Sequence, residues 1–211
     1  MTYQNTLTFA QELDAQDPLN DFRQEFIIPK ENGKEIIYLC GNSLGLQPKA
    51  TQGVLQEQLN NWAEYAVEGH FKGNTPWMTY HKAVRESLAK VVGAKPIEVS
   101  AMNSLSVNLH LLMVSFYRPT QQRYKIIVEA SAFPSDQYAF ETQAKHHGFN
   151  PDEAIIEIAP RAGEYTLRTE DIIATINEHK DSLALVLMGG VNYLSGQFFD
   201  LPAITKAAHA A

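Results

Sequence analysis

The sequence predicts an α/β domain built on a largely parallel β-sheet. From about residue 99 onward, short strand-like segments alternate with longer segments whose apolar residues recur at helical spacing. The strand-like segments are also apolar almost throughout, which is typical of parallel strands covered on both faces. These two observations, the alternation and the apolar strands, indicate the fold class.

The first fifty residues are expected to form a separate N-terminal segment, residues 1–50. One or two short helices are predicted over residues 9–26, broken near Asp17 and Pro18. A short strand is predicted at residues 36–39, where Ile-Ile-Tyr-Leu precedes a Gly-Asn-Ser-Leu-Gly loop.

The next segment is predicted to be helical. A helix after Pro48 places Leu55, Leu59, Trp62 and Ala66 on one face. Residues 69–76 interrupt the helical pattern with glycine and proline. A second amphipathic helix follows and is expected to end at a glycine C-cap, Gly93.

The alternating region completes a domain expected to span residues 51–211. The expected strands are residues 99–102, 124–129, 154–159 and 183–188, and the expected helices are residues 104–117, 134–147, 170–178 and a last one opening at Leu201-Pro202. The last helix has neither a cap nor a following strand. The sequence is therefore expected to be a large domain truncated before completion.

Composition excludes several classes of function. A net charge of −7 argues against a nucleic-acid partner, because neutralising phosphates needs a basic face. A single cysteine, Cys40, rules out an internal disulfide framework and a cysteine-based metal cluster. The first residues lack the pattern of a secretory signal, and the apolar runs are too short to span a bilayer. We expect a soluble, cytoplasmic protein with no membrane partner.

A candidate phosphate site lies where the sequence Met-Asn-Ser-Leu-Ser joins an expected strand to an expected helix. The free N–H groups of a helix N-terminus attract anions, and the hydroxyls of Ser104 and Ser106 add donors. Serine and asparagine are also ordinary N-caps. From spacing alone, capping is the simpler interpretation.

Two further turns follow expected strands, where ligands bind in open α/β sheets. Phe133 and Asp136 could stack on a heteroaromatic ring and pair with its protonated nitrogen, although core filling and helix capping explain them more simply. Gly189 and Gly190 allow either close approach to a ligand or a tight turn. Adjacent His146 and His147 do not share a helix face, so no metal site is expected.

Taken together, these segments resemble the kynureninase family. The matching runs are YLCGNSLGLQPKAT, EGHFKGNTPW, MNSLSVNLHLLMVSFYRPT, AFPSDQYA and GGVNYLSGQFFDLPAITKA, which occur in this order over nearly the whole chain. The resemblance implies the aspartate-aminotransferase-like fold of pyridoxal-phosphate (PLP) enzymes. It also implies a homodimer with active sites at the subunit interface.

The resemblance also implies roles for individual residues. Leu105 and Ser106 match donors to the PLP phosphate, Phe133 the aromatic that stacks on the ring, and Asp136 the carboxylate on its nitrogen side. Pro134 and Ser135 shape the same turn, and Gly189 stands where some family members supply a serine hydroxyl to the cofactor. Positions that line the substrate pocket are matched by Ser43, His70 and Met78.

The implied reaction is hydrolytic cleavage of L-kynurenine or 3-hydroxykynurenine to alanine and an anthranilate, in tryptophan catabolism and NAD biosynthesis. The family's Schiff-base lysine is implied to lie beyond residue 211. The chain alone is therefore expected to be inactive. Two alternatives stay open: another enzyme of this PLP class, such as a class V aminotransferase or a desulfurase, or an inactive fragment that acts as a binding module.

Overall fold

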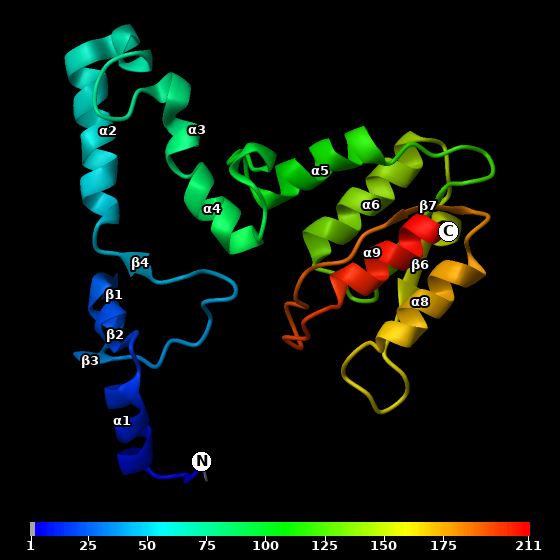
Figure 1. Ribbon diagram of the computed structural model, residues 1–211, viewed down its shortest axis with the longest axis horizontal. Helices are drawn as coiled ribbons and strands as arrows, with labels where there is room; N and C mark the ends of the chain where they lie inside the picture. Colours follow the sequence, from blue (N-terminus) through cyan, green and yellow to red (C-terminus); the bar gives the residue numbers. More distant parts are fainter. Residues whose placement is uncertain (1–2) are drawn as a thin grey trace. The chain divides into compact units, whose positions relative to one another are not determined.

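The computed structural model describes residues 3–211 and divides into two compact units, Met1–Ala101 and Met102–Ala211 (Figure 1). Each unit has its own internal contacts and is described by itself. The two units are defined by packing and divide after Ala101, whereas the sequence-based boundary after residue 50 separates an N-terminal segment from the domain that follows. That boundary stays a prediction.

The first unit consists of helices joined by short antiparallel pairs. Its α-helices are α1 (Leu7–Gln16), α2 (Thr51–Tyr65), α3 (Tyr80–Ala83) and α4 (Arg85–Val92), its 3₁₀ turns are η1 (Asn20–Glu25), η2 (Ala66–His70), η3 (Trp77–Thr79) and η4 (Pro96–Glu98), and its strands are β1 (Phe26–Ile27), β2 (Lys30–Glu31), β3 (Lys34–Glu35) and β4 (Gln47–Pro48). β1 pairs with β4 and β2 with β3. The expected helices are present, but the one after Pro48 ends at Tyr65, so Ala66, at a φ of +46°, is not on its face as predicted. The next is interrupted at Val84, between α3 and α4. Gly93 ends α4 at a φ of +69°, as predicted.

The predicted strand at residues 36–39 is wrong. Instead, β2 and β3 form a hairpin whose two-residue turn, Asn32 and Gly33, has positive φ at both positions. Beyond the hairpin, residues 36–39 make only one further backbone hydrogen bond across it within the described residues, from the N–H of Ile36 to the carbonyl of Pro29 (3.1 Å). The segment then has no strand partner between residues 3 and 211, and Ile37 and Leu39 are 88% and 85% exposed. An apolar segment becomes a strand only where a neighbouring backbone satisfies its N–H and C=O groups.

The predicted strand at residues 99–102 is wrong for the same reason. No strand pairs with these four residues in the described part of the chain, and they have no regular secondary structure. Their apolar character alone could not show whether a partner strand was within reach.

The second unit is a three-layer α/β structure and confirms the predicted fold class. Its elements are α5 (Leu105–Phe116), β5 (Lys125–Glu129), α6 (Pro134–His146), α7 (Pro151–Ala154), β6 (Ile155–Ile158), α8 (Thr169–Glu178), β7 (Leu183–Val186) and α9 (Leu201–Ala210). The strands are parallel in the order β6-β5-β7. The alternating strands and helices predicted from residue 124 onward are present in this unit.

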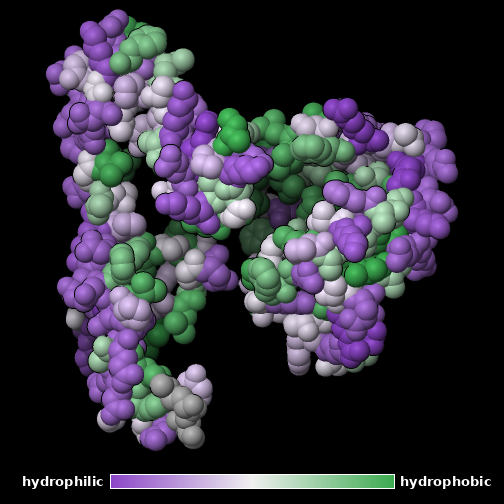
Figure 2. Space-filling view, viewed as in Figure 1, coloured by the Kyte–Doolittle hydropathy of each residue, from purple (hydrophilic) through white to green (hydrophobic). Residues whose placement is uncertain are grey.

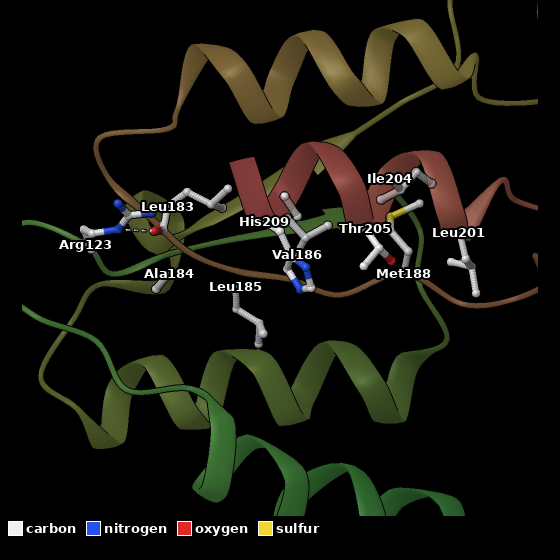
Figure 3. A pocket seen from close by; sticks show the side chains of 11 residues that line it. Arg123, Leu183, Ala184, Leu185, Val186, Met188, Leu201, Ile204, Thr205 and His209 are labelled. Atoms are coloured by element: carbon white, nitrogen blue, oxygen red, sulfur yellow. Dashed lines mark hydrogen bonds between the residues drawn. The ribbon is translucent and has the colours of Figure 1, made fainter. Parts of the chain in front are cut away.

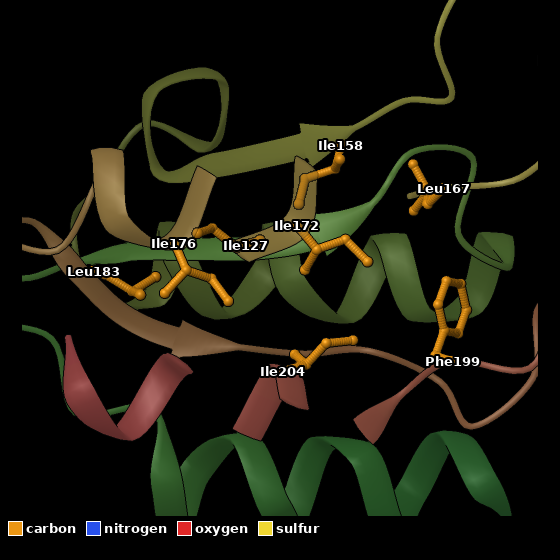
Figure 4. Close-up of a cluster of buried hydrophobic side chains, with 8 residues drawn as sticks. All are labelled: Ile127, Ile158, Leu167, Ile172, Ile176, Leu183, Phe199 and Ile204. Atoms are coloured by element: carbon orange, nitrogen blue, oxygen red, sulfur yellow. The ribbon is translucent and has the colours of Figure 1, made fainter. Parts of the chain in front are cut away.

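The central strand β5 separates two apolar cores. Ile126 and Val128 face one way and pack with Met113, Tyr117 and Phe140 from the side of α5 and α6. Ile127 faces the other way, into a cluster under α8 and α9 (Figure 4). Side chains alternate between the faces of a strand, so three consecutive apolar residues serve both cores. This explains the continuous apolar run in the sequence.

Hydrophobic side chains remain exposed on both units (Figure 2). On α2 the predicted apolar face includes Leu55, Leu59 and Trp62, which are each more than half exposed. Figure 2 thus shows a surface on which apolar and polar residues are interspersed. Between residues 3 and 211, no helix is both long enough and apolar enough to cross a membrane.

Candidate functional site

The turn after β5 forms the centre of the candidate site. Phe133 is the N-cap of α6, and its carbonyl accepts hydrogen bonds from the backbone N–H groups of Asp136 (2.8 Å) and Gln137 (3.1 Å). Pro134 occupies the first helical position, where its missing N–H costs nothing. Phe133 and Asp136 are therefore held on one helical turn, as the sequence predicted.

The side chains of this turn are accessible. Phe133 is 51% exposed, although large aromatic residues usually bury more of their surface. Asp136 is half-buried, and its Oδ1 accepts a 3.3 Å hydrogen bond from Ser135 Oγ. The turn therefore leaves an aromatic face and a carboxylate accessible at the surface of the unit, and Phe133 does not serve only to fill the core.

The N-terminus of α5 provides a second part of the site. Ser104 is its N-cap but makes no side-chain cap hydrogen bond, so its hydroxyl leaves the first-turn N–H groups available. Leu105 is exposed and Ser106 is half-buried. The preceding Asn103 has a positive φ of +32°, and Asn108 Nδ2 donates to the carbonyl of Met102 (2.9 Å), which fixes the entry to the helix.

The two helix starts lie at the same end of the unit. α5 and α6 pack against each other, and in Figure 1 the two helices and α9 all begin at the left of this unit. Parallel strands also place their following loops at one edge of the sheet. The structure thus gathers the α5 N-terminus and the Phe133 turn at the carboxyl end of the sheet.

The loop after β7 completes this edge. A Cβ built on Gly189 would lie 3.7 Å from Glu129 Oε1, so this glycine sits directly beside the end of β5. Tyr193 packs edge-on against Phe133, with ring centroids 5.3 Å apart and an interplanar angle of 81°. Gly189 and Phe133 therefore belong to the same region of the unit.

The predicted substrate-pocket residues lie in the first unit. His70 packs edge-on against Trp77, with centroids 5.3 Å apart, and Met78 follows Trp77 in η3. Both His70 and Met78 are exposed. Ser43 lies in a separate exposed turn, where its N–H donates to the carbonyl of Cys40 (2.9 Å). The unit thus brings His70 and Met78 close together, with Ser43 on another loop.

Three residues that lie at the site were not predicted from the sequence: Glu129, Asn192 and Tyr193. Glu129 ends β5 and accepts a 2.6 Å hydrogen bond from Asn192 Nδ2. Asn192 and Tyr193 follow the Gly189-Gly190 turn in the sequence, and nothing local to them indicates a role at the site. An acid at the end of an expected strand was the only local signal for Glu129, and such residues are common.

A separate hollow of about 430 Å³ lies between β7 and α9 (Figure 3). Leu185, Val186 and Ile204 contribute to its apolar lining, and Arg123 Nε donates to the carbonyl of Leu183 (2.9 Å) at one end. It contains none of the residues predicted for the site. The hollow is therefore separate from the edge at which the predicted site residues lie.

Comparisons with known proteins point to one family. The chain is 56% identical over 209 residues to the kynureninase of Flavobacterium psychrophilum and 57% identical over 211 residues to that of Flavobacterium johnsoniae. It is 49% identical to the kynureninase of Nematostella vectensis. These alignments cover 99%, 100% and 95% of the chain, and 49%, 50% and 46% of the relatives. No family model matches the chain.

Among solved structures, the apo structure of a cysteine desulfurase from Thermococcus onnurineus has a TM-score of 0.58 at 19% identity. The match covers 100% of this chain and 46% of that protein, and it concerns the fold. In sequence, the chain matches kynureninases over its whole length and spans about half of the length of these curated relatives.

Proposed function

We propose that this chain is part of a PLP-dependent kynureninase, which hydrolyses L-kynurenine or 3-hydroxykynurenine to alanine and an anthranilate. The observation that carries the proposal is the identity of 56–57% to kynureninases over essentially all of the chain. The identity to the cysteine desulfurase is only 19%. The sequence therefore favours kynureninase within this fold class.

The accessible groups of the second unit fit PLP. The first-turn N–H groups of α5, at Leu105 and Ser106, together with the Ser106 hydroxyl, suit a phosphate. The exposed face of Phe133 suits a planar pyridine ring, and the half-buried Asp136 suits the side of its protonated nitrogen. When bound, PLP supplies an electron sink for an amino-acid substrate.

The residues of the first unit suit the substrate. His70 is exposed and rests against Trp77, so its imidazole can donate a hydrogen bond to a ring hydroxyl. This favours tolerance of 3-hydroxykynurenine. Ser43 and Met78 are proposed to line the same pocket in the complete protein, which is proposed to be a cytoplasmic homodimer.

The complete reaction is proposed to need more than this chain. The relatives are about twice as long, and the family's Schiff-base lysine is proposed to lie in the half that this chain does not match. Such a lysine would hold the cofactor covalently and would move protons during the reaction. The 211-residue chain with added PLP is expected to release no fluorescent anthranilate from kynurenine.

Cofactor binding can be tested without catalysis. Pyridoxamine 5′-phosphate is a suitable probe, because its amine cannot form imines with surface lysines. Titration of the purified chain should show saturable binding that Phe133→Leu and Ser106→Ala each weaken by about 3- to 10-fold. An affinity that is the same in both variants and in the unmodified chain would contradict the proposed cofactor site.

A further inference from the structure

The segment from Gly189 to Phe199 is a closed loop held by its own backbone. Val191 and Phe198 form an isolated antiparallel bridge. The N–H of Asn192 donates to the carbonyl of Gln197 (2.9 Å), and the N–H of Phe199 donates to the carbonyl of Gly190 (3.1 Å). The loop therefore has a defined shape. The Gln197 side chain ties one part of it to the backbone of Leu167, accepting from its N–H (2.8 Å) and donating to its carbonyl (2.6 Å). The part that carries Tyr193 is held by a different contact, through Asn192.

The side-chain oxygen and nitrogen of Asn192 form hydrogen bonds with different segments of the unit. Its Oδ1 accepts three hydrogen bonds within the loop, from the N–H of Leu194 (3.0 Å) and from the N–H (2.8 Å) and Oγ (3.0 Å) of Ser195. Its Nδ2 instead donates to Glu129 Oε2 at 2.6 Å. The oxygen thus shapes the loop, and the nitrogen attaches it to the end of the central strand.

The next residue, Tyr193, packs edge-on against Phe133, with ring centroids 5.3 Å apart. Phe133 follows Glu129 closely in the chain, and Asn192 is adjacent to Tyr193. The two contacts therefore join the same two segments. The hydrogen bond has a carboxylate acceptor and a half-buried donor, so it is stronger and more directional than an aromatic edge contact.

We propose that Asn192 and Glu129 are positioning residues, whose hydrogen bond sets Tyr193 against Phe133 and so fixes the aromatic wall that holds the cofactor ring. The role in cofactor binding rests on the proposed function. Neither residue has to touch the cofactor. Their effect passes through the orientation of Phe133 and Tyr193.

Asn192→Asp separates the two functions of Asn192. Aspartate keeps an oxygen that accepts from Leu194 and Ser195, but it cannot donate to Glu129, and its charge repels the Glu129 carboxylate. Adding Glu129→Gln removes that repulsion and places an amide donor opposite the introduced carboxylate. The double variant N192D/E129Q therefore recreates the hydrogen bond with donor and acceptor exchanged.

The first readout is independent of the cofactor. In protein labelled with ¹³C at tyrosine rings, the Tyr193 signals report the ring current of Phe133, and loss of this shift in Phe133→Leu assigns them. N192D is expected to move these signals towards their positions in Phe133→Leu. E129Q alone should leave them nearly unchanged, because its amide oxygen still accepts, and N192D/E129Q should restore them.

The second readout is binding of pyridoxamine 5′-phosphate. N192D is expected to weaken it by about tenfold, with most of this loss recovered in N192D/E129Q. Asn150→Asp is the matched control, because it makes the same replacement in this unit, at a residue that caps α7 by accepting from Asp152 N–H through a side-chain oxygen that aspartate keeps. It should change neither readout.

Glu129→Ala is a second test that leaves the loop sequence intact, and it should shift the Tyr193 signals as N192D does. Unchanged signals in folded N192D or E129A, or failure of the double variant to restore them, would overturn the positioning role. Absence of pyridoxamine 5′-phosphate binding by the unmodified chain would instead count against the proposed function. The ring signals would still decide the positioning role in that case.

Discussion

The phenol of Tyr117 donates a 2.7 Å hydrogen bond to the backbone carbonyl of Tyr124, and the Tyr117 side chain is fully buried. The bond joins the residue after α5 to the residue before β5. It therefore links the proposed phosphate-binding helix to the strand that leads to Glu129 and Phe133. Tyr117 also packs edge-on against His147, with centroids 5.4 Å apart.

Replacing Tyr117 with phenylalanine should destabilise the protein. The ring packing is kept, but the Tyr124 carbonyl loses its partner in a buried setting, which costs about 1–2 kcal/mol. Chemical unfolding followed by circular dichroism measures this change. Tyr165→Phe is the control, because Tyr165 is 89% exposed, and it should alter stability by less than about 0.5 kcal/mol.

The same tyrosine should make stability sensitive to alkaline pH. Burial, with a smaller contribution from nearby Tyr124, raises the pKa of Tyr117 from 10.0 to about 12. Because the unfolded chain ionises first, the stabilisation is complete below pH 10 and is lost as pH rises through about 12. Unfolding free energies measured from about pH 9 to 11 should fall more steeply in the unmodified protein than in Tyr117→Phe. Parallel slopes would contradict the assignment to Tyr117.

Much of the second unit could be predicted because its signals are local. The run KIIVE is apolar at three consecutive positions, and this pattern indicates a strand that is buried on both faces. By contrast, residues 36–39 and 99–102 have apolar sequences but lack strand partners within residues 3–211. Pairing depends on distant backbone, so the local sequence could not distinguish these cases.

The candidate site likewise contains residues that the local sequence could predict and residues that it could not. Phe133 and Asp136 could be predicted together because they stand on one helical turn. The Glu129–Asn192 hydrogen bond joins residues 63 positions apart, and it exists only because β7 lies beside β5. A single sequence offers no signal for such a pair.

Replacing Gly69 with alanine should disturb the first unit. A Cβ at this position would lie 2.9 Å from Trp77 Cη2, closer than a Cβ atom approaches a non-bonded carbon atom in proteins. The indole must move, which weakens the hydrogen bond from Trp77 Nε1 to Gln58 Oε1 (3.0 Å). Overpacking of this kind costs about 1–3 kcal/mol. Tryptophan fluorescence and thermal unfolding should report the change.

Gly53→Ala is the matched control for this substitution. A Cβ on Gly53 meets no heavy atom within 4 Å, and the residue lies inside α2. Alanine there should stabilise the helix by about 0.5–1 kcal/mol. If Gly69→Ala were as stable as Gly53→Ala, the packing of Trp77 against Gly69 would have no energetic importance.

Replacing Gly189 with serine tests whether this position can contact the cofactor. A Cβ here would make only ordinary contacts, at 3.4 Å from the Val191 carbonyl oxygen and 3.7 Å from Glu129 Oε1, so stability should change by less than about 0.5 kcal/mol. The serine hydroxyl could donate to a ligand at the edge where Phe133 lies. One added hydrogen bond should tighten pyridoxamine 5′-phosphate binding by about 2- to 10-fold. Gly189→Ala adds the same Cβ without a donor and should leave affinity unchanged, so equal affinities in the serine and alanine variants would show that the hydroxyl does not reach the ligand.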